Sequence, residues 1–372
     1  MNSSLPILAV IVLFLLSTTT QFGFSVSSES PMDNFITWDD LNVKKNWDRL
    51  NLNDRFNSSR VIVVSKDGTG DSLTVQGAVD LVPLHNTLRV KILILPGIYR
   101  FPLCDDFEHL HPCREKVIVP ASKPYVSFIG TEANRTVISW NTKASDKDNN
   151  GQEIGTYNTA TVSIESDYFC ATKITFENTE VAVPGGVGMQ AVALRLSGDK
   201  SFLYKTRMLG SQDTLLDDTG THYFYKCYIQ GSIDFIFGNA RSLYEECTLY
   251  STARGPGAIA ASHRESAMEN TGFSFVQCKV KGSGNIYLGR AWGRYARTLY
   301  YHCDMEGIIT PIGWHDWGDP SRRWTVSFGE YQCRGKGANL GRRAPWSKSF
   351  TYEEAKPFLD KTYIEGDQWF RL

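Results

Sequence analysis

The chain has 372 residues, of which 42% are hydrophobic, and this is enough to bury a sizeable core, so a disordered protein is excluded. Its 39 basic and 40 acidic residues leave a formal net charge of −1, which gives no bulk electrostatic case for a protein that binds nucleic acid. Thirty-one glycines and a 12% share of aromatic residues, among many short apolar runs, favour strands and tight turns, so we expect an all-β fold.

The N-terminus has the layout of a secretory signal peptide. An apolar run from Leu5 to Leu16 is followed by small and polar residues. The alternative is a membrane anchor, but this run is short against the roughly 20 residues needed to span a bilayer. We expect residues 1–25 to be a signal peptide, residues 26–59 an N-terminal extension and residues 60–372 the folded domain. The secreted chain should then hold no membrane segment.

If the chain is exported, its eight cysteines are candidates for disulfides. None of them forms a C-x-x-C pair, so a zinc site has little support. Cys104 and Cys113 flank a short polar loop that they could close. Asn57 and Asn134 begin N-x-S/T sequons, which suit a secreted glycoprotein.

A repeat runs through the middle of the chain. An apolar residue, two variable positions, Cys or Thr, one variable position and a second apolar residue recur around Thr206, Cys227, Cys247, Cys278 and Cys303. The steps between these residues are 21, 20, 31 and 25 positions. Each unit is rich in short strand-like runs and has no long amphipathic helix, which predicts a parallel β-helix. The alternative is a sandwich whose strands are evenly spaced.

The tetrad Gly-Ser-x-Asp occurs twice in this repeat and ends at Asp213 and Asp234, each seven residues after a repeat position. Both carboxylates should therefore occupy the same register on successive coils, where stacked strands lie roughly 4.8 Å apart. Gln190 precedes Gln212 by about one coil. Two carboxylates so close cannot both ionise freely, so one stays charged and the other keeps a proton. The alternative is a pair of turn aspartates that bond their own backbone.

An acid pair alone leaves the reaction open. A retaining glycosidase uses carboxyls about 5 to 5.5 Å apart. An aspartic protease shares one proton between two acids, and 218–220 reads D-T-G, but that class needs a second such triplet, which the sequence lacks. Gln190 and Gln212 could donate to an oxyanion, which favours acyl transfer from an ester. Further along, Arg290 could hold one aspartate ionised, and Trp292 offers a flat face for a sugar ring.

Four segments resemble, in order and spacing, the signature segments of plant-type pectin methylesterases (pectinesterases): Gln190–Arg195, Gln212–Leu215, Asp234–Asn239 and Leu288–Trp292. The likeness begins near Val63 and continues through Gly313–Trp317 to Phe358–Trp369. It implies a right-handed parallel β-helix with short terminal helices, secreted to the cell wall, in which residues 60–372 form the pectinesterase domain of a short form without the inhibitor-like pro-region. The implied substrate is methyl-esterified homogalacturonan. The resemblance implies no metal or organic cofactor, a monomer, and a proteinaceous pectinesterase inhibitor as a further partner.

The resemblance also implies a role for each candidate residue. Asp234 would be the nucleophile on the methyl ester carbonyl. Asp213 would protonate the departing methanol and then activate water against the acyl-enzyme. Gln190 and Gln212 would stabilise the oxyanion, and Arg290 would orient Asp234 and keep it charged.

Trp292 and Trp314 would pack against the sugar chain by the same resemblance. Two positions and one segment depart from the family pattern: Phe101 stands where an acid is usual, Ala291 replaces proline, and Ala260–Arg264 reads AASHR instead of TAQGR. All presumed chemical groups remain, so we expect activity. Two rivals are a polygalacturonase or pectate lyase on the same solenoid and a wall-binding protein without turnover.

Two further expectations concern residues outside this set. His222 and His263 should be non-catalytic, because no Ser or Cys partner lies at a suggestive spacing. Thr351 to Glu354 forms a capping box, and Pro357 limits the helix that follows. We expect this short helical segment to cover the open end of the solenoid.

Overall fold

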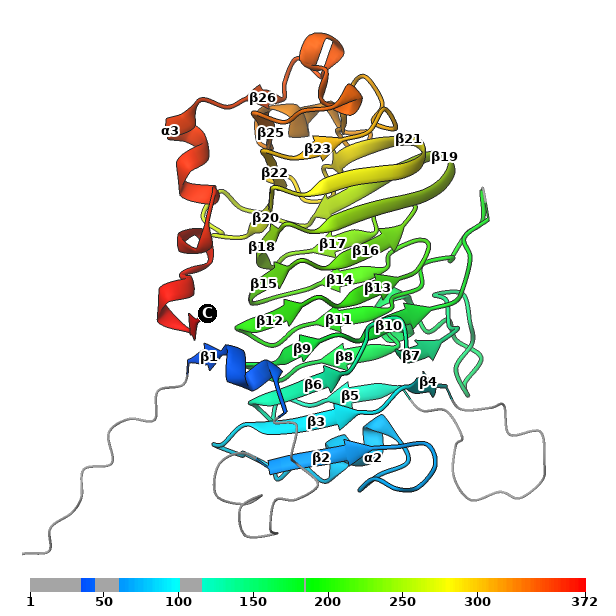
Figure 1. Ribbon diagram of the computed structural model, residues 1–372. Helices are drawn as coiled ribbons and strands as arrows, with labels where there is room; N and C mark the ends of the chain where they lie inside the picture. The colour runs from blue at the N-terminus through cyan, green and yellow to red at the C-terminus, as the bar shows by residue number, and fades with distance from the viewer. Residues whose placement is uncertain (1–34, 44–59, 101–115, 184) are drawn as a thin grey trace, which may run out of the picture. The chain divides into compact units, whose positions relative to one another are not determined.

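Short strands stack in parallel, coil upon coil, through most of the chain (Figure 1). The computed structural model describes residues 35–43, 60–100, 116–183 and 185–372. The predicted signal peptide, the Asn57 sequon, the Cys104–Cys113 loop and Phe101 lie outside these residues. Asn134, the other sequon, is exposed.

The strands form three ladders. The first ladder contains β5 (Val117–Val119), β8 (Val162–Ile164), β11 (Leu194–Leu196), β14 (Leu215–Asp217), β17 (Ile236–Gly238) and β24 (Trp314–His315). The second ladder contains β2 (Arg60–Val64), β3 (Val90–Ile94), β6 (Val126–Gly130), β9 (Cys170–Thr172), β12 (Ser201–Tyr204), β15 (Thr221–Tyr225), β18 (Arg241–Glu245), β20 (Gly272–Val276), β22 (Arg297–Tyr301), β25 (Ser327–Tyr331) and β26 (Lys348–Ser349). The third ladder contains β4 (Gly97–Tyr99), β7 (Thr136–Trp140), β10 (Thr175–Asn178), β13 (Arg207–Leu209), β16 (Tyr228–Gly231) and β23 (Asp304–Met305).

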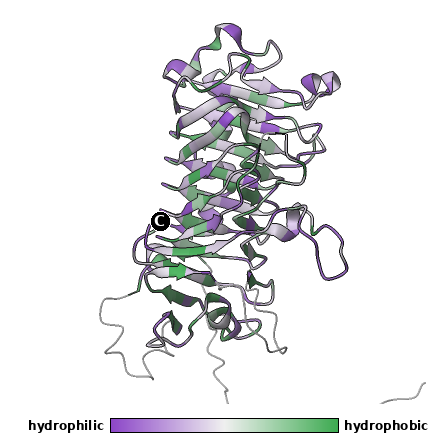
Figure 2. Cartoon of the chain, turned by 90° about the vertical axis from the view of Figure 1, so that its right-hand side faces the viewer, coloured by the Kyte–Doolittle hydropathy of each residue, from purple (hydrophilic) through white to green (hydrophobic). Residues whose placement is uncertain are grey.

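Two long strands, β19 (Thr248–Ser262) and β21 (Lys279–Arg290), run from the third ladder into the first without a turn between them. Every ladder pairing is parallel, and the chain is a right-handed parallel β-helix as predicted. Apolar residues follow the strands, whereas hydrophilic residues gather at the loops (Figure 2). Within the described ranges, no helix is long and apolar enough to span a membrane.

The predicted repeat register is confirmed by the strand pairing. Leu203 pairs with Phe224, which pairs with Tyr244 in the next coil. The apolar residues after each Cys or Thr also align: Met208, Ile229, Leu249, Val280 and Met305. These side chains are buried and form the core.

The cysteines of the repeat are free thiols. The six described cysteines, none of them in a disulfide, are Cys170, Cys227, Cys247, Cys278, Cys303 and Cys333. The disulfide prediction is therefore wrong for these six. Side chains in the same register of parallel strands point the same way at roughly 4.8 Å, whereas a disulfide brings the Cβ atoms to about 3.8 Å. Five of the thiols, all except that of Cys170, instead donate to carbonyls of the preceding coil, as Cys247 does to Phe224 at 3.4 Å.

The corner between the second and third ladders uses one left-handed residue in each of seven coils. These corner residues have φ between 47° and 55°: Lys173, Lys205, Lys226, Glu246, Gln277, His302 and Gln332. Each begins the short bend that turns the following side chain into the core. The N–H of Lys205 donates to the carbonyl of Tyr225 at 3.0 Å, which fixes one corner on the next.

Short helices complete the fold. α2 (Val75–Asp80) buries Val75, Ala78 and Val79 and packs against β2, β3 and β5. α3 (Tyr352–Ala355) has the predicted capping box at Thr351. The 3-10 helices are η1 (Trp38–Leu41), η3 (Thr156–Thr159), η4 (Pro320–Trp324), η5 (Lys336–Ala338), η6 (Leu340–Arg342), η7 (Lys356–Phe358), η8 (Lys361–Ile364) and η9 (Gly366–Gln368).

The C-terminal segment runs beside the second ladder, not over the end of the solenoid, so its predicted position is wrong (Figure 1). Its apolar side chains match the exposed apolar face of that ladder and bury it, as when Phe370 stacks on Tyr223 at 5.3 Å. β27 (Phe370–Arg371) pairs with β1 (Ile36–Thr37), and Asp40 forms an ion pair with Arg89 at 3.2 Å. Residues 35–43 of the N-terminal extension thus pack onto the solenoid.

Candidate active site

The two Gly-Ser-x-Asp turns connect the third ladder to the first in successive coils. Gln212 forms a parallel bridge with Ile233, and the N–H of Asp213 donates to the Ile233 carbonyl at 3.0 Å. Asp213 and Asp234 both have left-handed backbones, with φ of 62° and 45°. The predicted register is therefore confirmed, and the two aspartates are neighbours across adjacent coils.

The two carboxyl groups differ electrostatically. Asp234 is 7% exposed, and its Oδ2 lies 3.3 Å from Nη1 of Arg290. Burial raises the pKa of Asp234 to about 6, although the Arg290 guanidinium opposes this rise. Burial and the neighbouring Asp234 charge raise the pKa of Asp213 well above its usual range, again against Arg290. Asp234 therefore ionises first, and the pair keeps one proton on Asp213.

Several polar atoms at this site are buried without a hydrogen-bond partner in the described part of the chain: Gln190 Oε1, Asp234 Oδ1 and Arg290 Nε. Gln190 lies one coil before Gln212, since the N–H of Ala191 donates to the Gln212 carbonyl at 3.1 Å. Buried polar atoms are nearly always bonded in a native protein, so the open atoms on the neighbouring side chains of Asp234 and Arg290 indicate a ligand site. Among the described residues, no group of three or more His, Cys, Asp and Glu could hold a metal ion.

An apolar floor lies on the outer face of the first ladder. It consists of Ala160, Val192, Leu216, Phe237 and Ala261, with Trp292 and Trp317 packed against them. Leu216, Phe237 and Ala261 share one column with Arg290, because each pairs with the next in register. Trp292 lies 6.1 Å from Phe237 between ring centroids and is half-buried. Trp292 is therefore placed on the same face as the acid pair's arginine.

Trp314 does not lie on this face, so its predicted contact with sugar is wrong. Its side chain is 2% exposed and stacks on Phe328 at 4.7 Å in the core. Alternation within β24 turns Trp314 inward and His315 outward. Trp317 was missed by the sequence reasoning, yet its ring centroid lies 4.1 Å from the Arg290 guanidinium carbon. The G-W-x-x-W spacing was the available signal for it.

The two histidines have different surroundings. His222 is fully buried, and its Nδ1 lies 2.5 Å from Oδ1 of Asp217. His263 lies at the site, since its ring stacks on Trp292 with centroids 4.0 Å apart. Its Nε2 is 3.4 Å from the Glu265 carboxylate. One face of Trp292 is therefore covered by the imidazole that the AASHR segment supplies.

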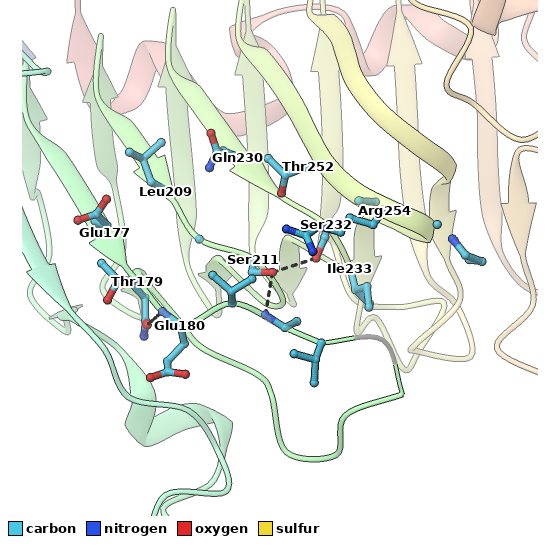
Figure 3. Close-up of a pocket in the computed structure, with 18 residues that line it drawn as sticks. Glu177, Thr179, Glu180, Leu209, Ser211, Gln230, Ser232, Ile233, Thr252 and Arg254 are labelled. Carbon is cyan, nitrogen blue, oxygen red and sulfur yellow. Dashed lines mark hydrogen bonds between the residues drawn. The ribbon is translucent and has the colours of Figure 1, made fainter.

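A cavity of about 550 Å³ shares the two turns but not the acid pair (Figure 3). Ser211 and Ser232 line it with their hydroxyls 3.3 Å apart, and the Ala182 N–H donates to Ser211 at 3.1 Å. Gln230 and Arg254 lie on other walls. Each turn thus presents its serine to this cavity and its aspartate to the neighbouring site.

Comparisons with known proteins agree with one another. Residues 61–367 match the family model described as Pectinesterase. Pectinesterase QRT1 of Arabidopsis thaliana is 55% identical over 377 residues, which cover 96% of each chain. A pectin methylesterase from carrot is 31% identical with a TM-score of 0.74, over 83% of this chain and 94% of that one. A pectin methylesterase from Aspergillus niger is 27% identical with a TM-score of 0.68 over the same shares.

Proposed function

Because the chain belongs to the pectinesterase family and is an esterase, we propose that its acid pair hydrolyses the methyl esters of homogalacturonan with Asp234 as nucleophile and Asp213 as general acid and base. The unequal surroundings of the two carboxyl groups carry this assignment. Asp234 has a cation at 3.3 Å, and its pKa of about 6 leaves it ionised at neutral pH. Asp213 lacks such a contact within the described residues and keeps its proton.

The reaction then proceeds in two steps. A carboxylate oxygen of Asp234 bonds to the ester carbonyl carbon, and the negative charge moves to the carbonyl oxygen, which accepts hydrogen bonds from the Gln190 and Gln212 amides. The bond to the methoxy oxygen breaks as Asp213 donates its proton, so methanol leaves and an acyl-enzyme anhydride remains. Asp213, now a carboxylate, takes a proton from water, whose oxygen attacks the anhydride and releases the free galacturonate.

The floor and the aromatic residues would hold the sugar chain. Trp292 offers the edge and face that His263 leaves open, and Phe237 lies below it. Trp317 supports the Arg290 guanidinium from its ring face. Arg290 thereby keeps its orientation toward Asp234 while the sugar is bound.

We also propose a division of the chain and a place of action. Residues 1–25 would direct export, residues 26–59 would form an extension and residues 60–372 would form the catalytic domain. The enzyme would act in the cell wall, where its methylated polymer lies. A monomeric state and recognition by a proteinaceous pectinesterase inhibitor are predictions of the same kind.

Methanol release from highly methylated pectin, measured together with product length, tests the proposed reaction. We expect methanol from the purified chain without shortening of the polymer, and none from Asp234→Asn. Shorter chains would indicate a hydrolase, and unsaturated ends that depend on calcium a lyase. Pectin binding with no methanol release would indicate a wall-binding protein.

A further inference from the structure

Three of the seven corner residues are lysines in consecutive coils. Thr172 pairs with Tyr204, and Tyr204 pairs with Tyr225, so the lysines that follow them, Lys173, Lys205 and Lys226, form one row. The rungs of this row are roughly 4.8 Å apart. All three side chains are exposed.

The lysine row carries little compensating charge. Lys226 lies 3.5 Å from the Glu246 carboxylate, but both side chains are about 40% exposed, so the pair is weak. Neither Lys173 nor Lys205 forms an ion pair with any residue in the described ranges. Half-buried Arg207 adds a fourth positive charge two residues beyond Lys205. Like charges opposite one another on neighbouring strands are destabilising.

The fold does not need lysine at this corner. The next four coils use Glu246, Gln277, His302 and Gln332 in the same backbone conformation. A left-handed backbone favours glycine or asparagine over lysine, so conformation does not explain the choice either. Neither the fold nor the backbone conformation therefore explains three lysines in a row, whereas an anionic ligand would offset their repulsion.

Aromatic rings hold two of the three ammonium groups in place. Lys205 Nζ lies 4.9 Å from the centroid of the Tyr204 ring, and Lys226 Nζ lies 4.7 Å from that of Tyr225. The two tyrosine rings stack on each other at 5.6 Å. This arrangement offers regularly spaced cations beside a stack of partly buried rings, which suits a polymer with regularly spaced negative charges.

We propose that the lysine row binds a stretch of de-esterified galacturonan, a polymer with one carboxylate on each sugar. This inference rests on the proposed function, because that polymer is the expected product. The row lies at the corner between the second and third ladders, whereas the acid pair lies in the turns between the third ladder and the first, and its floor lies on the first ladder. The enzyme can therefore hold already processed polymer while its active site works on methylated residues, which raises the local substrate concentration.

The test compares two triple variants of the full chain. Lys173→Gln, Lys205→Gln and Lys226→Gln together remove the row, and glutamine is the residue that the chain itself uses at corners 277 and 332. Lys336→Gln, Lys348→Gln and Lys356→Gln remove the same charge from exposed positions elsewhere. The readouts are the affinity for fully de-esterified polygalacturonate and methanol release from a methylated oligomer too short to reach the corner.

We expect the row variant to bind polygalacturonate about tenfold more weakly, with a shallower salt dependence, because three exposed cations are lost. The control variant should bind as the unmodified chain does, and all three proteins should release methanol from the oligomer at equal rates. Equal affinity of the two variants would overturn the proposal. An equal loss of affinity for dextran sulfate would also overturn it, since the row would then be a general cation patch. Absence of methanol from the unmodified chain would count against the proposed function alone.

Discussion

Asp213 and Asp234 have the same side chain and the same backbone conformation, but only Asp234 contacts a cation. Because the nucleophile must be ionised, we expect turnover to fall below pH of about 6, the pKa of Asp234 in the folded chain. A pH profile of kcat/KM for methanol release measures this acid limb. A midpoint of this fall near the ordinary aspartate pKa of about 4 would contradict Asp234 as the nucleophile.

The raised pKa of Asp234 also affects folding. The folded chain binds this proton more tightly than the unfolded chain, so the contribution to stability is complete below pH of about 4 and is lost as the pH rises through about 6. Asp234→Asn removes the titration. The quantity to compare is the free energy of unfolding of the variant minus that of the unmodified chain. We expect this difference to be about 2 kcal/mol larger at pH 7 than at pH 4. Denaturant titrations at both pH values measure it, and an unchanged difference would argue against burial of this carboxyl group.

Arg290→Lys should lower kcat by about 10- to 100-fold, because a point ammonium cannot reproduce the planar guanidinium that lies over Trp317 and reaches Asp234. Since Arg290 lowers the pKa of Asp234, the acid limb should also move to higher pH. Arg294→Lys is the matched control, because Arg294 is exposed nearby. An unshifted limb with normal kcat would exclude the proposed contact.

At the scale of the elements, substitutions at the corner residues test how much the left-handed backbone costs in stability. Gln277 has φ of 54°, so Gln277→Gly should leave the free energy of unfolding unchanged or raise it by up to about 1 kcal/mol. Gln277→Val should lower it by about 1–2 kcal/mol, because a β-branched residue fits the left-handed region poorly. The same changes at Gln230, in strand β16, should have the opposite order, since valine suits a strand. Thermal or denaturant unfolding of the four variants measures this.

The strand register could be read from the sequence because each coil repeats one Cys or Thr between two inward apolar residues, as in Phe224, Cys227 and Ile229. The place of Asp213 beside Asp234 followed from this register. Trp314 could not be placed in the same way, because β24 has only two residues and its alternation gives no pattern. For the six described cysteines the disulfide prediction was wrong, because the sequence suggests export but does not give the direction in which neighbouring thiols point.

At the scale of the whole molecule, the C-terminal segment covers the outer face of the second ladder. Trp369 is 1% exposed and donates its indole N–H to the Ile364 carbonyl at 2.9 Å. Trp369→Ala should lower the free energy of unfolding by about 3–5 kcal/mol. Trp324→Ala, at a residue that is 88% exposed, should change it by less than about 0.5 kcal/mol. Denaturant unfolding compares them, and equal effects would mean that the segment is not part of the stable fold.

The position of this segment could not be predicted from the sequence. Its apolar residues could pack over the open end of the solenoid or along the outer face of a ladder. The choice depends on the second ladder, whose outward residues Phe202, Tyr223 and Leu243 are apolar and need covering. The same face receives Trp38 from the N-terminal extension, 6.0 Å from Phe202. Both ends of the described chain therefore stabilise a surface that sequence periodicity alone would treat as solvent-exposed.

The buried thiols have a practical consequence. Five of the described cysteines are each at most 1% exposed, so a reagent cannot reach their sulfurs while the coils stay closed: Cys170, Cys227, Cys247, Cys278 and Cys303. An alkylating probe can label these sulfurs only through transient local opening. Mass spectrometry of the labelling rate at Cys170, Cys227, Cys247, Cys278 and Cys303 would therefore show which coils of the solenoid open first, with no need for an added reporter group.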